Sequence, residues 1–314
     1  MDFFTQLVTD PPGFYASHEL LIAQIGINSI LAISIFLTLY SGQLTLANVG
    51  FMAIGAYTTV ILDINYHVPV PAGMALGALF AGLVGFVVGL PVLRLRGVFL
   101  AIATLGFGEA LRNGVILNLD ITGRGQGLKN PDANINDILP ILVTLAVLAY
   151  AVWRLTGTKL GHAWAAIRED ELAASSQGIN VPAYKMSAFV LGAVIAGFAG
   201  GLESHINFFV DPTEYGTTRA IQVLTFAVVG GTTNILGPIV GAATLTSLPE
   251  IVRQAAAYRD VISGVILILV IIFRPKGILG GGGLAIIRPR WWPAAWTLRK
   301  HGCLLYTSPS PRDS

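Results

Sequence analysis

The sequence predicts an all-α fold, a polytopic bundle of about nine transmembrane helices within a range of about eight to ten. Three observations predict it. First, 11% of the 314 residues are charged and 54% are hydrophobic, whereas soluble domains are about 25% charged. Second, the hydrophobic residues form runs of roughly 20, the length that crosses a bilayer. Third, the chain has 36 glycines, and small residues let membrane helices pack closely.

Composition also excludes several function classes. A soluble enzyme, a disordered chain and a nucleic-acid-binding protein all need far more charge than this sequence has. The single cysteine, Cys303, leaves no disulfide framework and no thiolate metal cluster. No lysine follows a glycine, so the phosphate-binding loop that ends in Gly-Lys is missing, and the five histidines are scattered. We therefore expect no enzymatic activity and no cofactor bound by this chain.

Nine hydrophobic segments are expected to span the membrane. Pro71, Pro91 and Pro140 lie at segment ends, where the missing backbone N–H costs least. The segments between 219 and 250 are short and rich in glycine, which leaves the count open and allows re-entrant helices. In chain order the segments are 19–40, 43–62, 69–92, 97–118, 138–155, 186–209, 219–233, 236–250 and 259–273.

Two polar stretches interrupt this pattern. Residues 119–137 contain three glycines followed by Asn130 and Pro131, and they predict a loop outside the membrane. Residues 156–185 contain alanines and glutamates that favour a helix, and Gly178 suits the end of that helix. The second stretch therefore predicts a cytoplasmic helix lying outside the bilayer.

The positions of the basic residues predict the orientation of the chain. The first lysine or arginine is Arg94, and the later ones cluster at 154–185 and from Arg274 onwards. Because basic clusters lie on the cytoplasmic side, we expect the N-terminus outside, the C-terminus inside and an odd number of spans. Residues 1–18 then form an outside N-terminal segment without the basic start of a signal peptide, and residues 19–280 form the transmembrane domain.

A pattern of glycines and alanines occurs twice with the same spacing, and a second pattern matches at nearly the same offset. Since the two copies would cross the membrane in opposite directions, they predict an inverted internal repeat, which places a substrate path at the repeat interface. Chance matching among so many glycines and alanines is the alternative. The first pattern pairs Gly77, Ala78, Ala81, Gly82 and Gly85 with Gly192, Ala193, Ala196, Gly197 and Gly200, and the second pairs Gly97, Ala101, Ile102, Leu105 and Phe107 with Gly216, Ala220, Ile221, Leu224 and Phe226.

Charged residues within the expected spans are costly and are therefore candidates for function. Glu109 and Arg112 lie three residues apart on one helical face, where they can form an ion pair. That pair is either structural or part of a substrate pathway. Glu203 and His205 lie near the outer end of their helix, within reach of interfacial water.

Uncharged polar residues and glycines around the second span are likewise either structural or part of a substrate pathway. Gln43 and Asn48 suit hydrogen bonds between helices, as does Asn28 in the first span. The glycines of this region allow close helix packing or a break in the helix, and a broken helix exposes N–H groups that can hold a carboxylate. The glycines concerned are Gly42, Gly50 and Gly55.

Several blocks of sequence occur in a characteristic order between about residues 25 and 280. They are Ser41–Leu46, Gly50–Tyr57, Thr104–Glu109, Thr122–Leu128, Gly161–Glu171, Ala173-Ala174, Gly178–Asn180, Gly230-Gly231, Leu236–Pro238, Gly241-Ala242 and Arg274–Gly277. Together they resemble the membrane permease subunits of bacterial ABC importers for branched-chain amino acids. Arg124 departs from the family pattern, in which a glycine is commoner at that place.

The resemblance implies a multi-subunit importer in the bacterial inner membrane. In it, this chain forms a heterodimer with a homologous permease, two ATPase subunits use the ATP, and a periplasmic protein binds the substrate. Lipid surrounds the permeases, and no nucleic acid takes part. Closure of the ATPases would pull on loop 156–185 and switch the bundle between outward-open and inward-open states. The residues implied for this coupling are Gly161, Ala165, Arg168, Glu169, Asp170, Glu171, Ala173 and Gly178.

Two other functions are alternatives. A urea or amide permease of the ABC class shares these blocks, so the substrate is open among leucine, isoleucine, valine and small amides. A standalone secondary transporter or channel would carry flux without ATPase partners.

The last residues differ in character from the rest. Residues 281–300 combine Arg288 and Arg290 with three tryptophans, which suits a tail at the membrane surface. Residues 301–314 are a polar run that resembles translated adapter sequence. We expect this last run to be non-native and dispensable for transport.

Overall fold

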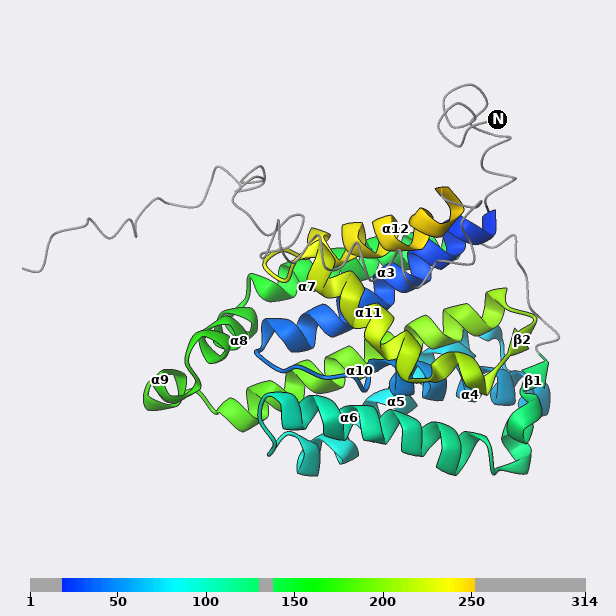
Figure 1. Ribbon diagram of the computed structural model, residues 1–314, viewed down its shortest axis with the longest axis horizontal. Coiled ribbons are helices and arrows are strands. Elements are labelled where there is room, and N and C mark those ends of the chain that lie inside the picture. The colour runs from blue at the N-terminus through cyan, green and yellow to red at the C-terminus, as the bar shows by residue number, and fades with distance from the viewer. Residues whose placement is uncertain (1–18, 130–137, 252–314) are drawn as a thin grey trace, which may run out of the picture. The chain divides into compact units, whose positions relative to one another are not determined.

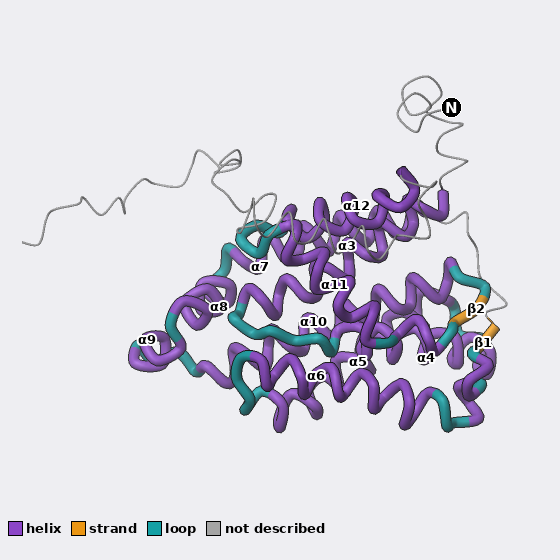
Figure 2. The backbone as a smooth tube through the Cα atoms, in the orientation of Figure 1, coloured by secondary structure: helices purple, strands orange, loops and turns teal. Residues whose placement is uncertain are grey.

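The computed structural model describes residues 19–129 and 138–251, which are mainly helical (Figures 1 and 2). Six of the described helices are long and apolar enough to cross a membrane, and two further apolar helices are shorter. The six are α3 (Glu19–Tyr40), α4 (Asn48–Tyr66), α5 (Val70–Val92), α6 (Val98–Ala110) with its π-helical continuation η1 (Leu111–Ile116), α7 (Ile138–Thr156) and α10 (Val181–Ile206). The shorter two are α11 (Thr217–Gly230) and α12 (Leu236–Ile251).

These helices confirm the all-α class and match eight of the nine expected segments. The ninth expected span, 259–273, lies outside the described residues, as do the N-terminal segment 1–18 and the tails 281–300 and 301–314. The count of nine spans and the parity drawn from it therefore stay predictions.

Two helices begin away from the expected residues, each for a local reason. Gly42 adopts a φ of +78°, which ends the first span in a tight turn. The residues after it run without helix until α4, and the backbone N–H of Leu46 donates to the hydroxyl of Thr104 at 2.9 Å. Helix α10 begins earlier than residue 186 because the side chain of Asn180 caps it, accepting from the N–H of Ala183 at 3.4 Å.

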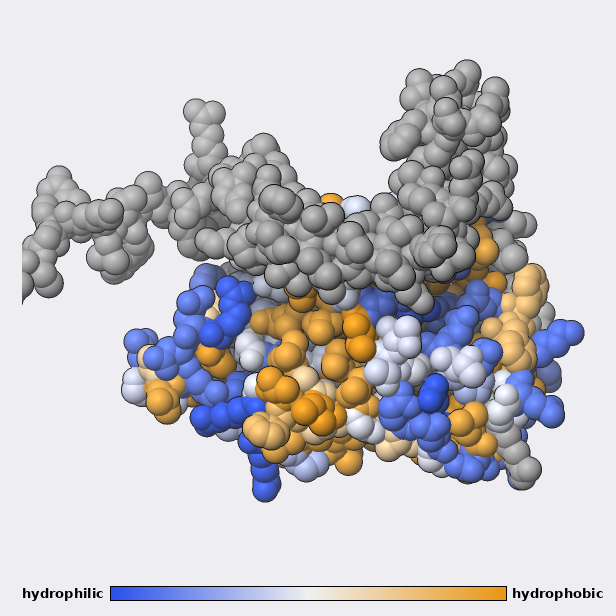
Figure 3. All heavy atoms as spheres, in the orientation of Figure 1, coloured by the Kyte–Doolittle hydropathy of each residue, from blue (hydrophilic) through white to orange (hydrophobic). Residues whose placement is uncertain are grey.

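Helix α10 lies at the centre of the bundle, packed against α3, α4 and α5, and α3 also contacts α7, α11 and α12. Most residues of α3, α4 and α10 are buried, whereas α5, α6 and α7 carry exposed apolar side chains such as Leu79 and Phe99. On the face drawn in Figure 3, hydrophobic side chains gather beside the hydrophilic end formed by α8 and α9. A surface of this kind suits contact with lipid.

Helices α5 and α10 touch through the small residues of the first repeated pattern. A Cβ atom added to Gly197 would lie 2.5 Å from the Cβ of Ala81, and one added to Gly85 would lie 2.7 Å from the Cβ of Ala193. Later residues of α5 contact earlier residues of α10, since Met74 lies at Gly201 and Gly89 lies at Met186. The two helices are therefore antiparallel neighbours. The two copies of the pattern thus pack on each other, while their relation by an inverted repeat stays a prediction.

The two ends of the helical bundle carry different elements (Figure 1). At one end lie α8 (Lys159–Glu169) and α9 (Glu171–Ser176). At the other, β1 (Leu128–Lys129) pairs antiparallel with β2 (Phe209–Val210), which ties the stretch before residue 130 to the connection between α10 and α11. Short 3₁₀ turns accompany this pair, namely η2 (Asp120–Thr122), η3 (Arg124–Gln126) and η4 (Pro212–Tyr215).

The stretch 156–185 contains two helices where the sequence predicts one. Asp170 leaves the helical conformation, with φ −154° and ψ 112°, and its side chain accepts from the N–H groups of Leu172 and Ala173. An aspartate in that position ends α8 and caps α9. The loop between the long helices α7 and α10 is therefore two short helices joined by a sharp bend.

Candidate functional site

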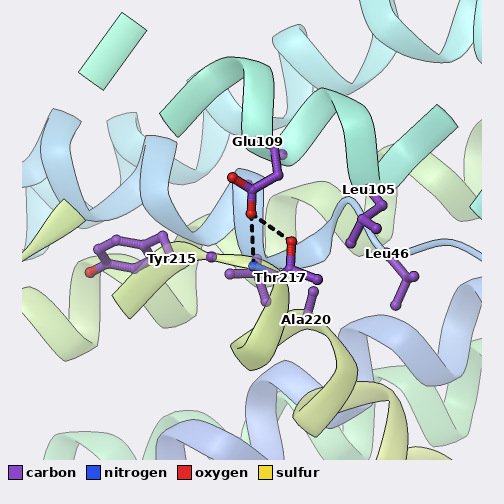
Figure 4. A pocket seen from close by; sticks show the side chains of 10 residues that line it. Leu46, Leu105, Glu109, Tyr215, Thr217 and Ala220 are labelled. Carbon is purple, nitrogen blue, oxygen red and sulfur yellow. Dashed lines mark hydrogen bonds between the residues drawn. The ribbon is translucent and has the colours of Figure 1, made fainter. Parts of the chain in front are cut away.

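A small pocket lies where α4, α6 and α11 meet, between the two ends of the bundle (Figure 4). Its walls are mainly apolar, with one carboxylate and two hydroxyl groups among them. The lining residues are Leu46, Val49, Gly50, Leu105, Gly108, Glu109, Tyr215, Gly216, Thr217 and Ala220. Residues of α4, α6 and the turn before α4 supply one wall, and α11 with the turn before it supplies the other.

Glu109 joins these two walls. Figure 4 shows its side chain pointing from α6 to the start of α11, where Oε1 accepts from the backbone N–H of Thr217 at 2.9 Å and from its hydroxyl at 2.6 Å. Its Oε2 accepts from Arg112 at 3.0 Å and from Asn113 at 3.1 Å. The predicted Glu109–Arg112 ion pair is thereby confirmed. A carboxylate at a helix N-terminus is also favoured by the helix dipole, so Glu109 holds α6 against α11.

Glu203 is not at the water interface, as its position near the helix end suggested. Its side chain is 8% exposed and accepts from Arg219 at 2.7 Å, which joins α10 to α11. Tyr215 donates its hydroxyl to the other oxygen at 3.2 Å, and Arg219 also donates to Asn28 in α3 at 3.3 Å. Burial and the neighbouring Glu203 charge raise the pKa of Tyr215 well above its usual value, so its hydroxyl stays a donor.

Polar residues near the start of α4 bond other helices. The amide of Gln43 donates to the carbonyl oxygen of Lys185 at 2.9 Å, which ties the α3–α4 turn to α10. The amide of Asn48 donates to the hydroxyl of Ser34 in α3 at 2.8 Å. Side-chain bonds between helices are the use that the sequence suggested for residues of this kind.

The three glycines lie at close contacts between elements. A Cβ on Gly42 would lie 3.1 Å from the Cα of Arg168 in α8, and one on Gly50 would lie 3.3 Å from the Cα of Gly108 in α6. A Cβ on Gly55 would overlap the carbonyl oxygen of Gly197 in α10. The overlap at Gly55 and the positive φ of Gly42 favour glycine there. A methyl group at Gly50 would need only a small shift of its neighbour, and Gly50 also lines the pocket.

Helix α8 is anchored to the bundle by Trp164, which is fully buried. Its indole N–H donates to the carbonyl oxygen of Tyr184 in α10 at 2.9 Å. Gly161 is buried against Thr156 at the end of α7, where a Cβ would overlap the Thr156 backbone. Ala165 follows on the partly buried side of the helix. These contacts attach α8 to α7 and α10.

Helix α9 projects further from the bundle and is held by ion pairs of Glu171 and by the buried side chain of Ala174, which packs in a small apolar cluster. Glu171 pairs with Lys185 of α10 at 2.9 Å and lies 3.8 Å from Arg96. Gly178 closes the helix with a φ of +83°, a conformation that favours glycine at a C-terminal cap. Ala173 is exposed. The free surface of α9 is therefore short, rigid and open to a partner.

The charged residues around the bend differ in exposure. Glu169 is exposed and Arg168 is partly buried, and their side chains approach to 3.6 Å. The guanidinium of Arg168 lies 5.5 Å from the ring centre of Tyr40 and donates to the carbonyl oxygen of Thr232 at 3.4 Å. The resemblance implies that Arg168 offers its charge to a partner, whereas the structure places its guanidinium against Tyr40 of α3 and the α11–α12 connection.

The sequence did not reveal the partners of the partly exposed Glu109 and the buried Glu203. Thr217 and Arg219 bind Glu109 and Glu203 from the first turn of α11. Arg219 carried a usable signal, because a lone arginine at the start of an apolar segment needs an acidic partner nearby. Nothing in the sequence marked Thr217, since its backbone N–H and hydroxyl reach Glu109 only after α6 and α11 pack together.

Comparisons with known proteins agree with this architecture. A family model described as "Branched-chain amino acid transport system / permease component" matches residues 18–271. The high-affinity branched-chain amino acid transport system permease protein LivM of Escherichia coli (strain K12) is 33% identical over 272 residues, covering 76% of this chain and 64% of that protein. The chain thus spans less than two thirds of the length of its LivM relatives.

Two further relatives in Escherichia coli (strain K12) are more distant. The permease protein LivH of the same transport system is 31% identical over 163 residues, covering 51% of this chain and 52% of LivH. The ribose import permease protein RbsC is 25% identical over 290 residues, covering 84% of this chain and 88% of RbsC. No solved structure matches.

The family match covers most of the chain, including every described helix and both carboxylate-centred contacts at α11. Six described helices are long and apolar enough to cross a membrane, as a multi-pass protein of the inner membrane requires. This chain belongs to the family of permease components of branched-chain amino acid transport systems.

Proposed function

We propose that this chain is the permease subunit of an ATP-driven importer that moves branched-chain amino acids across the inner membrane. The observation that carries the proposal is the family match over residues 18–271, supported by LivM and LivH, whose names state that transport system. The chain itself is not an enzyme in this proposal and binds no cofactor. ATP is used by partner subunits.

The loop between α7 and α10 is the proposed docking site for an ATPase. Its α8 is pinned by Trp164, while α9 presents Leu172 with 74% of its surface exposed next to the exposed carboxylate of Glu169. An exposed apolar side chain with a charged rim suits insertion into a partner's groove. Because α8 is attached to α10 through Trp164 and α9 is capped by Asp170, a pull on them reaches the bundle without being absorbed by a loose chain.

Alternating access is the proposed mode of transport. The pocket beside Glu109 and Thr217 lies on the boundary between α6 and α11, where the two halves meet. A relative shift of these helices would open that boundary to one side of the membrane or the other. Glu109 and Glu203 act in this proposal by holding α11 in place, and Gly55 acts by packing α4 on α10.

The proposed assembly follows from the family. This chain pairs with a homologous permease, two ATPases dock on the cytoplasmic side, and a periplasmic binding protein delivers the substrate. The N-terminus lies outside and the C-terminus in the cytoplasm, as the basic clusters predict. Labelling of single cysteines placed at residues 2 and 280 with a membrane-impermeant reagent tests that orientation.

Uptake by the reconstituted complex tests the function. We expect ATP-dependent accumulation of labelled leucine in proteoliposomes, competed by isoleucine and valine and not by urea or ribose. Competition by urea would favour an amide permease, and competition by ribose would favour the activity named for RbsC. Ion- or voltage-driven flux through the purified chain without ATPases would replace the proposal with a secondary transporter or channel.

A further inference from the structure

Helix α11 is held at both of its ends by charged side chains from other elements. At its first turn, Glu109 of α6 accepts two hydrogen bonds from Thr217, beside the pocket. Beyond its last residue, the connection to α12 is contacted by Arg168 of α8 through the carbonyl oxygen of Thr232. One helix of 14 residues therefore runs from the loop at the α8–α9 end to the pocket.

The contact of Arg168 is built from several elements at once. Its guanidinium lies over the ring of Tyr40 at the end of α3, 5.5 Å from the ring centre, and reaches Thr232 at 3.4 Å. Its backbone packs on the α3–α4 turn at Gly42, where even a Cβ atom would lie 3.1 Å away. The guanidinium also lies 3.6 Å from Glu169 of its own helix. Its contacts with the Tyr40 ring and the Thr232 carbonyl oxygen are the ones that join α8 to other elements.

Helices α11 and α12 form a stiff hairpin on the far side of that contact. A Cβ on Gly230 would overlap the carbonyl oxygen of Gly237, and a Cβ on Gly241 would overlap that of Phe226. At these glycines the two helices touch backbone to backbone, where no side chain can change rotamer to absorb a displacement. A displacement at Thr232 is therefore carried along α11 to Thr217.

We propose that Arg168 is a positioning residue that transmits movement of the α8–α9 loop to α11 and so to the pocket between α6 and α11. This inference rests on the proposed function, because it needs a partner that moves the loop. It assigns Arg168 an internal role and leaves docking to the exposed residues around Leu172. Loss of the side chain should separate ATP hydrolysis from uptake, which loss of folding would not do.

The transport test uses the full reconstituted complex with labelled leucine as the probe. For Arg168→Gln we expect ATP hydrolysis close to wild type and leucine uptake lowered about tenfold, the effect of losing one charge-assisted hydrogen bond. For Arg168→Lys we expect an intermediate uptake, because a single ammonium group cannot span both Tyr40 and Thr232. The matched control is Arg154→Gln, an exposed arginine at the end of α7, for which both rates should stay at wild type.

Several results would overturn the inference. If Arg168→Gln takes up as much leucine per ATP hydrolysed as the wild type, Arg168 does not transmit movement from the α8–α9 loop to α11. If Arg168→Gln does not assemble, Arg168→Lys decides, and full uptake per ATP in that variant counts against the route. Equal loss of hydrolysis and uptake in both variants would show a docking or folding role instead.

Hydrogen exchange of the purified chain tests the inference separately from the proposed function. We expect Arg168→Gln to raise exchange at the amides of the α11–α12 connection and the first turns of α11, with no change in Arg154→Gln. Unchanged exchange in both variants would contradict the route even where leucine uptake is normal. If wild-type complexes take up no leucine but Arg168→Gln still raises hydrogen exchange in α11, the proposed function is wrong. The structural link between Arg168 and α11 is then still supported.

Discussion

Glu203 and Arg219 approach to 2.7 Å across the interface of α10 and α11, with side chains 8% and 21% exposed. In such surroundings each charge depends on the other, because removing one leaves the other desolvated without a counter-ion. The pair is surrounded by further donors and acceptors, since Tyr215 bonds the carboxylate and Asn28 bonds the guanidinium. It is the polar centre of an otherwise apolar contact.

Breaking this ion pair should cost more than replacing it. We expect Glu203→Ala to lower the free energy of unfolding by about 3–5 kcal/mol, because Arg219 is left buried and unpaired. The double variant Glu203→Leu with Arg219→Met should recover much of that loss. Unfolding in mixed micelles, monitored by tryptophan fluorescence, measures both, and an equal loss in the single and double variants would contradict the assignment.

Gly55 should tolerate no larger residue. We expect Gly55→Ala to destabilise the protein by about 1–3 kcal/mol, since its methyl group would overlap the backbone of Gly197 and force α4 away from α10. Gly106→Ala is the matched control, because an added Cβ there meets nothing within 4 Å. Thermal unfolding in one detergent should show a lower midpoint for the first variant alone.

Glu109 and Thr217 should be energetically coupled. We expect Thr217→Val, which removes the hydroxyl donor and keeps the backbone donor, to cost about 1 kcal/mol. In a double-mutant cycle with Glu109→Gln the effects should fall short of additivity by about 0.5–1 kcal/mol. Glu109 is partly exposed, so solvent limits the size of the term. Strict additivity of the two losses would show that the contact contributes nothing.

Substitutions of Trp164 should show how much this side chain contributes to holding α8 against the bundle. Trp164→Phe removes the hydrogen bond to Tyr184 and should cost about 1 kcal/mol. Trp164→Ala leaves a cavity under α8 and should cost about 3–5 kcal/mol. Proteolysis within residues 157–180 should be faster in the alanine variant, and wild-type resistance there would show that other contacts suffice to hold the helix.

Leu172 should matter for assembly and not for stability. It is 74% exposed, so Leu172→Asp should change the free energy of unfolding by less than about 0.5 kcal/mol. Its effect should appear as weaker co-purification with the ATPase subunits, because a charge would replace the apolar contact. Full recovery of ATPase with this variant would place the docking surface elsewhere.

Hydrophobic run length predicts the long helices well. The expected segments 19–40, 69–92 and 138–155 lie within a residue of α3, α5 and α7, because bilayer thickness sets both their length and their composition. The start of α4 is missed, since residues 43–47 are as apolar as a helix and only the φ of Gly42 ends the first one. Backbone conformation of that kind is set by contacts with α8, which hydropathy does not encode.

The site is less predictable than the helices. Glu109 and Arg112 are visible because a helix brings residues three apart together. The bond from Glu109 to Thr217 joins positions 108 residues apart, and no local pattern marks it. The bend at Asp170 has a readable signal, an aspartate before a helical run, yet helix propensity alone runs through it. Long-range partners depend on how α6, α10 and α11 pack.

The contact between α5 and α10 sets where this protein can deform. Where these helices meet at Gly85 and Gly197, the facing residues are Ala193 and Ala81, whose methyl groups have no rotamers to change and so resist sliding. Together with α4, which joins them through Gly55, they form a core that shifts as one block. Rearrangement is then confined to boundaries lined by longer side chains, such as those of α3 with α7 and of α6 with α11. Evolution could change the substrate by altering those boundaries and leave the block untouched.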